Sequence, residues 1–312
     1  IGDNMLLNIT LLILGLILII VSSNVFVDSA SNLATSFKVP KMVIALTIAS
    51  FSTCAPELAI SFNSISSNNY DLTLANVVGS CVVNILLIIG LASIVKPVKV
   101  KTVTVGKELP LLVITTVVFC ILFSDGELSR YDAGILILLF VLFGIYLYKM
   151  IKRFRKVDEE YAKVNKVKAI ILTILSILAI IFSSDLIVNS TLYLSERLNI
   201  ATKLISMIVI VIGTSLPELM ITITSSKKGE FDMTVGNIIG TNIFNICIVL
   251  GLPTLIYGSV YSSAFNYVDL IAVIVAAAMF YFQSRSERTI TRLEGVIMVS
   301  LFICYYAYLI FL

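Results

Sequence analysis

The stretch VIGTSLPELM, residues 211–220, places a proline followed by a glutamate, Glu218, in the middle of an apolar run. The stretch FSTCAPELAI, residues 51–60, repeats the arrangement with Glu57. A carboxylate at the centre of a bilayer costs about 2.5–3.5 kcal/mol on insertion scales. If the chain spans a membrane, two such costs in matching surroundings indicate a functional site.

The composition is that of a membrane protein. The 312 residues are 59% hydrophobic and 13% charged, with a mean hydropathy of +1.05, whereas soluble domains are about 45–50% apolar and about 25% charged. Apolar stretches long enough to cross a bilayer recur throughout. We therefore predict an all-α polytopic membrane protein with ten spans, at residues 5–35, 39–66, 70–94, 108–125, 131–150, 166–196, 200–226, 231–258, 267–284 and 290–311.

Several function classes are disfavoured by what the sequence lacks. It has no histidine, which weakens any histidine proton relay. Its five cysteines are scattered through the spans and suggest no disulfide framework. There is no GxxxxGK[ST] motif, which argues against an ATP-driven pump. We expect no cofactor, no nucleotide or nucleic-acid partner and no enzymatic activity; the first span is too long for a cleaved signal peptide.

Basic residues predict the orientation. Residues 149–168 hold eight of the 22 Lys and Arg residues. If this segment is cytoplasmic and the spans alternate, eleven others lie on the same side, and only Arg130, Arg197 and Lys203 lie outside. This is the positive-inside pattern. We predict a multi-pass protein of the cell membrane with both termini outside, and a basic cytoplasmic linker at 151–165 rather than a nucleic-acid patch.

The chain repeats itself after 161 residues. ANVVGSCVVNILLIIGLAS (75–93) aligns without a gap on GNIIGTNIFNICIVLGLPT (236–254), and the two Pro-Glu blocks align in the same register. Each copy holds five spans, and an odd number inverts the second copy in the membrane. We predict two inverted five-helix repeats, residues 1–150 and 166–312.

The prolines predict breaks in the second and seventh helices. Proline has no N–H, and its ring clashes with the carbonyl four residues back. Pro56 and Pro217 should therefore free carbonyl groups, which are tolerated at membrane depth only where they line a cavity. Glu57 and Glu218 would face each other there and repel unless a cation or a proton lies between them. An all-oxygen site suits Ca²⁺, which takes about 6–8 oxygen ligands.

The third and eighth spans each carry a polar stripe at a spacing of four residues. Its members are Asn76, Ser80 and Asn84 in one copy, and Asn237, Thr241 and Asn245 in the other. These side chains could ligate ions or join helices as interhelical hydrogen bonds, and for the hydroxyls both readings stay open.

These blocks resemble the α-repeats of the cation/Ca²⁺ antiporter superfamily, most closely its sodium/calcium exchanger branch of prokaryotic type. The resemblance implies ion sites between the second, third, seventh and eighth helices, and gating by sliding of the first and sixth. Asn at position 245, where the potassium-dependent branch tends to carry Asp, implies potassium independence. The implied ligands are Glu57 and Glu218, the carbonyls of Thr53 and Thr214, the Ser215 hydroxyl, and Ser80, Asn84, Thr241 and Asn245.

The first copy departs from the family pattern. Ser52 and Ala75 stand where glycine is usual, and Cys54 stands where the resemblance implies a sodium-ligating serine. A neutral thiol is a poor ligand for a hard ion. One sodium site is therefore weakened or absent unless Ser50, one turn earlier, supplies a hydroxyl. The alternative is that these substitutions are neutral and do not change ion binding.

The sequence thus favours an antiporter that exchanges Ca²⁺ for Na⁺ by alternating access and works as a monomer. The alternative is exchange of a divalent cation (Ca²⁺, Mg²⁺ or Mn²⁺) against protons through the same glutamates. A passive channel fits two inverted copies of a broken helix less well, and an intramembrane protease lacks the usual aspartyl or serine chemistry.

Overall fold

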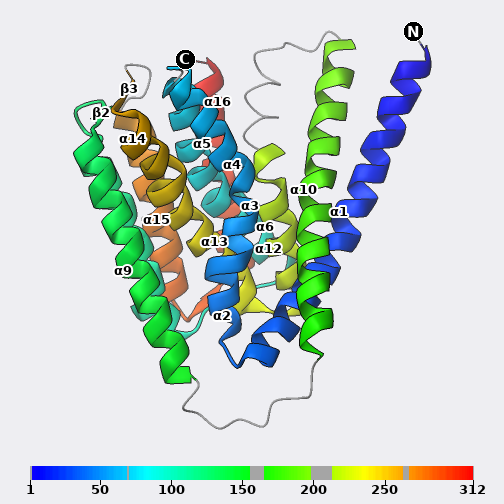
Figure 1. Ribbon diagram of the computed structural model, residues 1–312, viewed down its shortest axis with the longest axis horizontal. Coiled ribbons are helices and arrows are strands. Elements are labelled where there is room, and N and C mark those ends of the chain that lie inside the picture. Colours follow the sequence, from blue (N-terminus) through cyan, green and yellow to red (C-terminus); the bar gives the residue numbers. More distant parts are fainter. Residues whose placement is uncertain (1, 69, 155–164, 198–212, 263–266, 312) are drawn as a thin grey trace.

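The computed structural model describes residues 2–68, 70–154, 165–197, 213–262 and 267–311. It is a bundle of long helices (Figure 1). The helices before the linker are α1 (Gly2–Phe37), α2 (Lys41–Ile44), η1 (Ala45–Ala49), α3 (Ser50–Thr53), α4 (Ala55–Ser66), α5 (Tyr70–Val82), η2 (Val83–Ile89), α6 (Gly90–Val95), α7 (Thr102–Gly106), α8 (Glu108–Leu122) and α9 (Arg130–Phe154).

The second half repeats this order. Its helices are α10 (Lys166–Arg197), α12 (Leu216–Lys228), α13 (Phe231–Phe244), η3 (Asn245–Leu250), α14 (Gly251–Tyr257), α15 (Tyr267–Arg285) and α16 (Arg292–Phe311). Among the described residues, eight helices are long and apolar enough to span a membrane, or nine if α2 to α4 form one bent span. The predicted seventh span at 200–226 begins outside the described residues.

The two halves run in opposite directions. α1 descends from the end of the molecule that carries both termini, whereas α10 ascends toward it from the opposite end (Figure 1). Four two-residue strands, which were not predicted from the sequence, form hydrogen-bonded pairs between the two halves. β1 (Val98–Lys99) pairs with β4 (Thr289–Ile290), and β2 (Glu127–Leu128) pairs with β3 (Val260–Tyr261). Each ladder therefore joins a loop of one half to a loop of the other.

The third and eighth spans form the core of the bundle. Of the most apolar 18-residue segment of each span, 78% is buried in Tyr70–Val95 and 83% in Phe231–Tyr257. The corresponding share is 17% in both α1 and α9. These two central spans carry the polar stripes. Because their surroundings exclude lipid and bulk water, any polar atom on them needs a partner inside the protein.

The second span is broken where the sequence predicts it. Lys41–Thr53 and Ala55–Ser66 meet at an angle of 47°, with Cys54 between them and Pro56 in the first turn of α4. Proline is accepted at this position because the first turn of a helix needs no N–H donor there. In the described part of the seventh span, Ser215 is a turn residue after helical Gly213 and Thr214, and α12 begins at Leu216. The fold expectation of two repeated halves with Pro-Glu breaks is confirmed.

Candidate functional site

The two glutamates lie in the first turns of α4 and α12, at the breaks. Their side chains are buried, with 1% of Glu57 and none of Glu218 exposed. The two carboxylates lie within electrostatic reach of one another, Thr214 lies beside Glu57, and Thr53 lies beside Glu218. Each half therefore places a threonine next to the glutamate of the other half, as an inverted repeat requires.

The carboxylate oxygens lack well-formed hydrogen bonds. None of the four oxygens of Glu57 and Glu218 has a partner of good geometry among the described residues. The N-terminal ends of α4 and α12 offset part of the negative charge, because a helix N-terminus carries a positive partial charge. That offset is small beside the cost of two buried, unpaired carboxylates. A bound cation would therefore stabilise this arrangement.

The polar stripes of α5 and α13 line the same region. Ser80, Asn84, Thr241 and Asn245 are each at most 1% exposed, and the hydroxyl and amide groups of all four lack hydrogen-bond partners within the described part of the chain. An unpaired buried polar group costs about 1–3 kcal/mol. Several such groups beside two carboxylates indicate where a ligand belongs.

The last asparagine of each stripe lies in a π-helical turn. Asn84 lies in η2, and Asn245 begins η3. A π-helical turn inserts an extra residue into the helix and is frequent at functional sites. These turns were not predicted, although the identical register of the two asparagines in the repeat was a signal for a special position.

The remaining predicted residues divide into two groups. Ser215 is 1% exposed, and its hydroxyl has no partner among the described residues, so it is free to ligate an ion. The Cys54 sulfur instead lies 3.8 Å from the Thr241 carbonyl oxygen. The Ser50 hydroxyl lies 2.8 Å from the Ala45 carbonyl and 3.0 Å from that of Asn237. The hydroxyl hydrogen of Ser50 is thus used by backbone carbonyls of η1 and α13, and only its lone pairs remain for an ion.

Asn76 and Asn237 support the site from one turn away. The Asn76 amide donates to the Glu57 carbonyl over 3.3 Å, and the Asn237 amide donates to the Thr222 hydroxyl over 3.1 Å. These bonds fix α4 on α5 and α12 on α13. Both residues were predicted to lie on the polar stripes, but this supporting role was not predicted.

Two aspartates of the long helices lie apart from this region. Asp28 on α1 pairs with Lys228 of α12 over 2.6 Å, and Asp185 on α10 is exposed. No group of three or more His, Cys, Asp or Glu residues gathers in the described ranges. A cation at the Glu57–Glu218 pair would therefore use two carboxylates and otherwise neutral oxygens.

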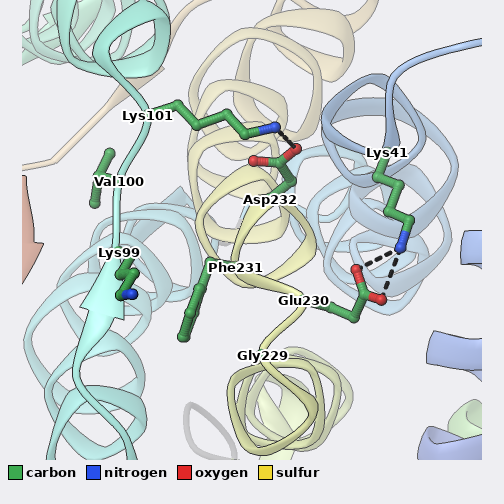
Figure 2. Close-up of a pocket in the computed structure, with 8 residues that line it drawn as sticks. All are labelled: Lys41, Lys99, Val100, Lys101, Gly229, Glu230, Phe231 and Asp232. Atoms are coloured by element: carbon green, nitrogen blue, oxygen red, sulfur yellow. Dashed lines mark hydrogen bonds and ion pairs between the residues drawn. The ribbon is translucent and has the colours of Figure 1, made fainter. Parts of the chain in front are cut away.

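A pocket of about 500 Å³ lies at the end of the bundle opposite the termini. Figure 2 shows that two ion pairs bridge it. Lys41 Nζ lies 2.7 Å from each carboxylate oxygen of Glu230, and Lys101 Nζ lies 2.7 Å from Asp232. Because both lysines belong to the first half and both carboxylates to the second, these pairs hold the halves together at this end.

We expect the Lys41–Glu230 pair to contribute modestly to stability. In a double-mutant cycle of Lys41→Gln and Glu230→Gln, the coupling free energy of unfolding should be about 0.5–1 kcal/mol in low salt. It should be smaller in 0.5 M salt, because salt screens partly exposed ion pairs. Lys101, with 69% of its side chain exposed, should couple more weakly to Asp232. Thermal melting in detergent measures both cycles. A Lys101–Asp232 coupling larger than that of Lys41–Glu230 would contradict this ordering.

Comparisons with known proteins agree with this fold. A protein-family model described as "Sodium/calcium exchanger protein" matches residues 7–149 and 168–311 of this chain. The chain is 33% identical to the putative antiporter CaxA of Alkalimonas amylolytica, over 96% of this chain and 97% of that one. It is 26% identical to the sodium/calcium exchanger MaX1 of Methanosarcina acetivorans, over 98% and 99%. A solved structure of the sodium-calcium exchanger NCX_Mj superposes with a TM-score of 0.85 at 26% identity, covering 97% of this chain and 99% of that one.

Proposed function

Since the chain belongs to the sodium/calcium exchanger protein family, we propose that it exchanges Ca²⁺ for Na⁺ by alternating access. The observation that carries the proposal is the pair of buried carboxylates, Glu57 and Glu218, without well-formed hydrogen bonds. Two negative charges match one Ca²⁺ or a small number of Na⁺ ions. The two cations compete for the same oxygens, so each displaces the other.

The proposed ligands fall into three classes. The carboxylates of Glu57 and Glu218 supply charge, and the carbonyls of Thr53 and Thr214 join them on Ca²⁺. Neutral side-chain oxygens of the third and eighth spans complete the ligand set, from Ser80, Asn84, Thr241 and Asn245. The Ser215 hydroxyl serves Na⁺. Hard cations favour such all-oxygen sites.

Alternating access is assigned to α1 and α10. These helices pack closely on each other, since a Cβ added at Gly15 would lie 2.8 Å from Ile187 Cγ1. α1 is mostly exposed in its most apolar part, so it buries little surface against the core and can slide at low cost. Movement of this pair would open the carboxylates first to one side of the membrane and then to the other.

The proposed location is the cell membrane, with both termini outside and the linker at 151–165 in the cytoplasm. The positive-inside pattern supports this orientation. So does the position of both termini at one end of the bundle, with the C-terminal end of α9 and the start of α10 at the other (Figure 1). One chain contains every residue of the candidate site, which supports a functional monomer.

Uptake of ⁴⁵Ca²⁺ into proteoliposomes tests the exchange. With pH clamped on both sides, an outward Na⁺ gradient should drive uptake, and a Na⁺ ionophore should abolish it. Uptake driven by a proton gradient without Na⁺ would instead support the second candidate, exchange of a divalent cation against protons. Cys54 favours that candidate, because its sulfur stands where a sodium-ligating hydroxyl is expected. Flux without obligatory exchange would indicate a channel.

Cys54 and Ser215 provide a matched pair of variants. We expect Cys54→Ser to lower the Na⁺ concentration for half-maximal Ca²⁺ uptake, and Ser215→Cys to raise it, each by about tenfold, because one oxygen contact to an ion contributes about 1–2 kcal/mol. The half-saturating Ca²⁺ concentration should change less. Equal Na⁺ dependence in both variants and the wild type would exclude a sodium-ligating role at either position.

A further inference from the structure

A second cavity lies at the end of the bundle that carries the pocket of Figure 2, and it shares Lys101 and Asp232 with that pocket. Its volume is about 660 Å³. Its lining residues come from α2 and the turn that leads into it, from α7 and the two lysines that flank it, from α9 and from α13. None of the proposed cation ligands lines it, so its role is separate from ion transport.

Four cationic side chains line this cavity: Lys101, Lys107, Lys149 and Arg153, hereafter the basic pocket. Lys101 pairs with Asp232. In the described part of the chain the other three form no ion pair within 4.0 Å. Like charges gathered around one cavity repel one another. The basic pocket therefore has a net positive charge that an anion would neutralise.

Apolar side chains form the rest of the wall. Met42 and Val103 both line the cavity; Met42 is 4% exposed, whereas Val103 on α7 is 53% exposed. Met150, one turn from Arg153 on α9, is partly buried beside them. A cationic rim next to an apolar wall, at the ends of membrane-spanning helices, matches a molecule with a charged head and an apolar body.

We propose that the basic pocket binds the headgroup of an anionic phospholipid of the cytoplasmic leaflet, with two phosphates preferred over one. The side of the membrane rests on the proposed orientation, which puts these helix ends in the cytoplasm. Basic pockets between spanning helices on that side suit anionic headgroups. Three cations outside any ion pair exceed the single charge of one phosphodiester, even though Lys107 lies within electrostatic reach of the Glu108 carboxyl. Arg153 can bind a phosphate through two N–H groups at once.

Lipid retention measured by native mass spectrometry of the full-length protein in detergent tests the proposal. The probes are cardiolipin with two phosphates, phosphatidylglycerol with one, and phosphatidylcholine with no net charge. We expect one tightly held cardiolipin per chain, weaker phosphatidylglycerol and no preferential phosphatidylcholine. Lys107→Gln, Lys149→Gln and Arg153→Gln together should weaken cardiolipin binding on the order of 100-fold, since each cation contributes about a factor of five.

A control variant removes three cations from the same end of the bundle but outside the basic pocket: Lys152→Gln, Lys168→Gln and Arg285→Gln. All three side chains are exposed. We expect it to bind cardiolipin within threefold of the wild type, and both variants to melt like the wild type without lipid. Equal losses in the two variants would show that only general surface charge acts, and would overturn the proposal.

Two further results would also overturn it. Inorganic pyrophosphate binding as tightly as cardiolipin would show a site for soluble anions. The linker carries Asp158, Glu159 and Glu160 after α9. If cardiolipin bound only after these three were changed to Asn or Gln, the acidic segment would be the occupant. Because every readout is lipid binding, failure here leaves the proposed ion exchange untouched.

Discussion

Glu57→Gln and Glu218→Gln should each lower Na⁺-driven Ca²⁺ uptake by at least about 100-fold. Glutamine keeps the size and one oxygen of the side chain but removes its charge. Ca²⁺ in the altered site would face one carboxylate, and removing a partner from a buried, paired charge costs about 3–5 kcal/mol. That range corresponds to at least a 100-fold loss in affinity. Initial rates of ⁴⁵Ca²⁺ uptake measure the effect.

Glu127→Gln is the matched control, because Glu127 is an exposed glutamate on β2. We expect its uptake to equal that of the wild type. Melting without ions gives a second readout: the site variants should melt at the same temperature as the wild type or higher, since each removes an uncompensated buried charge. Loss of uptake together with a large fall in melting temperature would indicate a structural role for these glutamates.

Gly240→Ala should destabilise the folded protein. A Cβ at this position of α13 would collide with the Ser50 hydroxyl and lie 2.9 Å from both Cα and O of Leu46. Leu46 presents backbone atoms, which cannot rotate away as a side chain can. We expect a loss of about 1–3 kcal/mol, as for other overpacked cores, with a broken Ser50–Asn237 bond and impaired transport.

Gly144→Ala is the control for this substitution. Gly144 lies within α9 on an exposed face, where an added Cβ meets nothing within 4 Å. Alanine also has the higher helix propensity, so the melting temperature should stay the same or rise slightly. If Gly240→Ala melted like Gly144→Ala, the close approach of α13 to η1 would not be a feature of the folded protein.

The repeat made the architecture predictable. A shift of 161 residues aligned Pro56 with Pro217 and Asn84 with Asn245, and five spans per copy required inversion. Proline chemistry predicted breaks at the two Pro-Glu motifs, and the structure has them just before these motifs, at Cys54 and Ser215. Burial of Glu57 and Glu218 followed from their apolar surroundings. These features depend on local sequence and on symmetry, which a single chain displays.

Other features depend on contacts between distant segments. The strand pairs form because loops of the two halves meet, and no local pattern in Val98–Lys99 specifies Thr289–Ile290 as a partner. The π-helical turns η2 and η3 are stable only in their packed surroundings. The short helix α7 was missed because Lys101 and Lys107 flank it and resemble a polar loop. Ser50 stays a predicted spare ligand through its lone pairs, but its hydrogen bond to the Asn237 carbonyl depends on tertiary packing and was not predicted.

The most direct test of the central claim is an experimental density map of the protein saturated with Ca²⁺ and free of Na⁺. We expect one Ca²⁺ peak between α4 and α12, about 2.3–2.6 Å from a carboxylate oxygen of both Glu57 and Glu218, and its disappearance when Na⁺ replaces Ca²⁺. A peak held by one glutamate alone, or two separate peaks with one glutamate each, would contradict a site shared between the inverted halves.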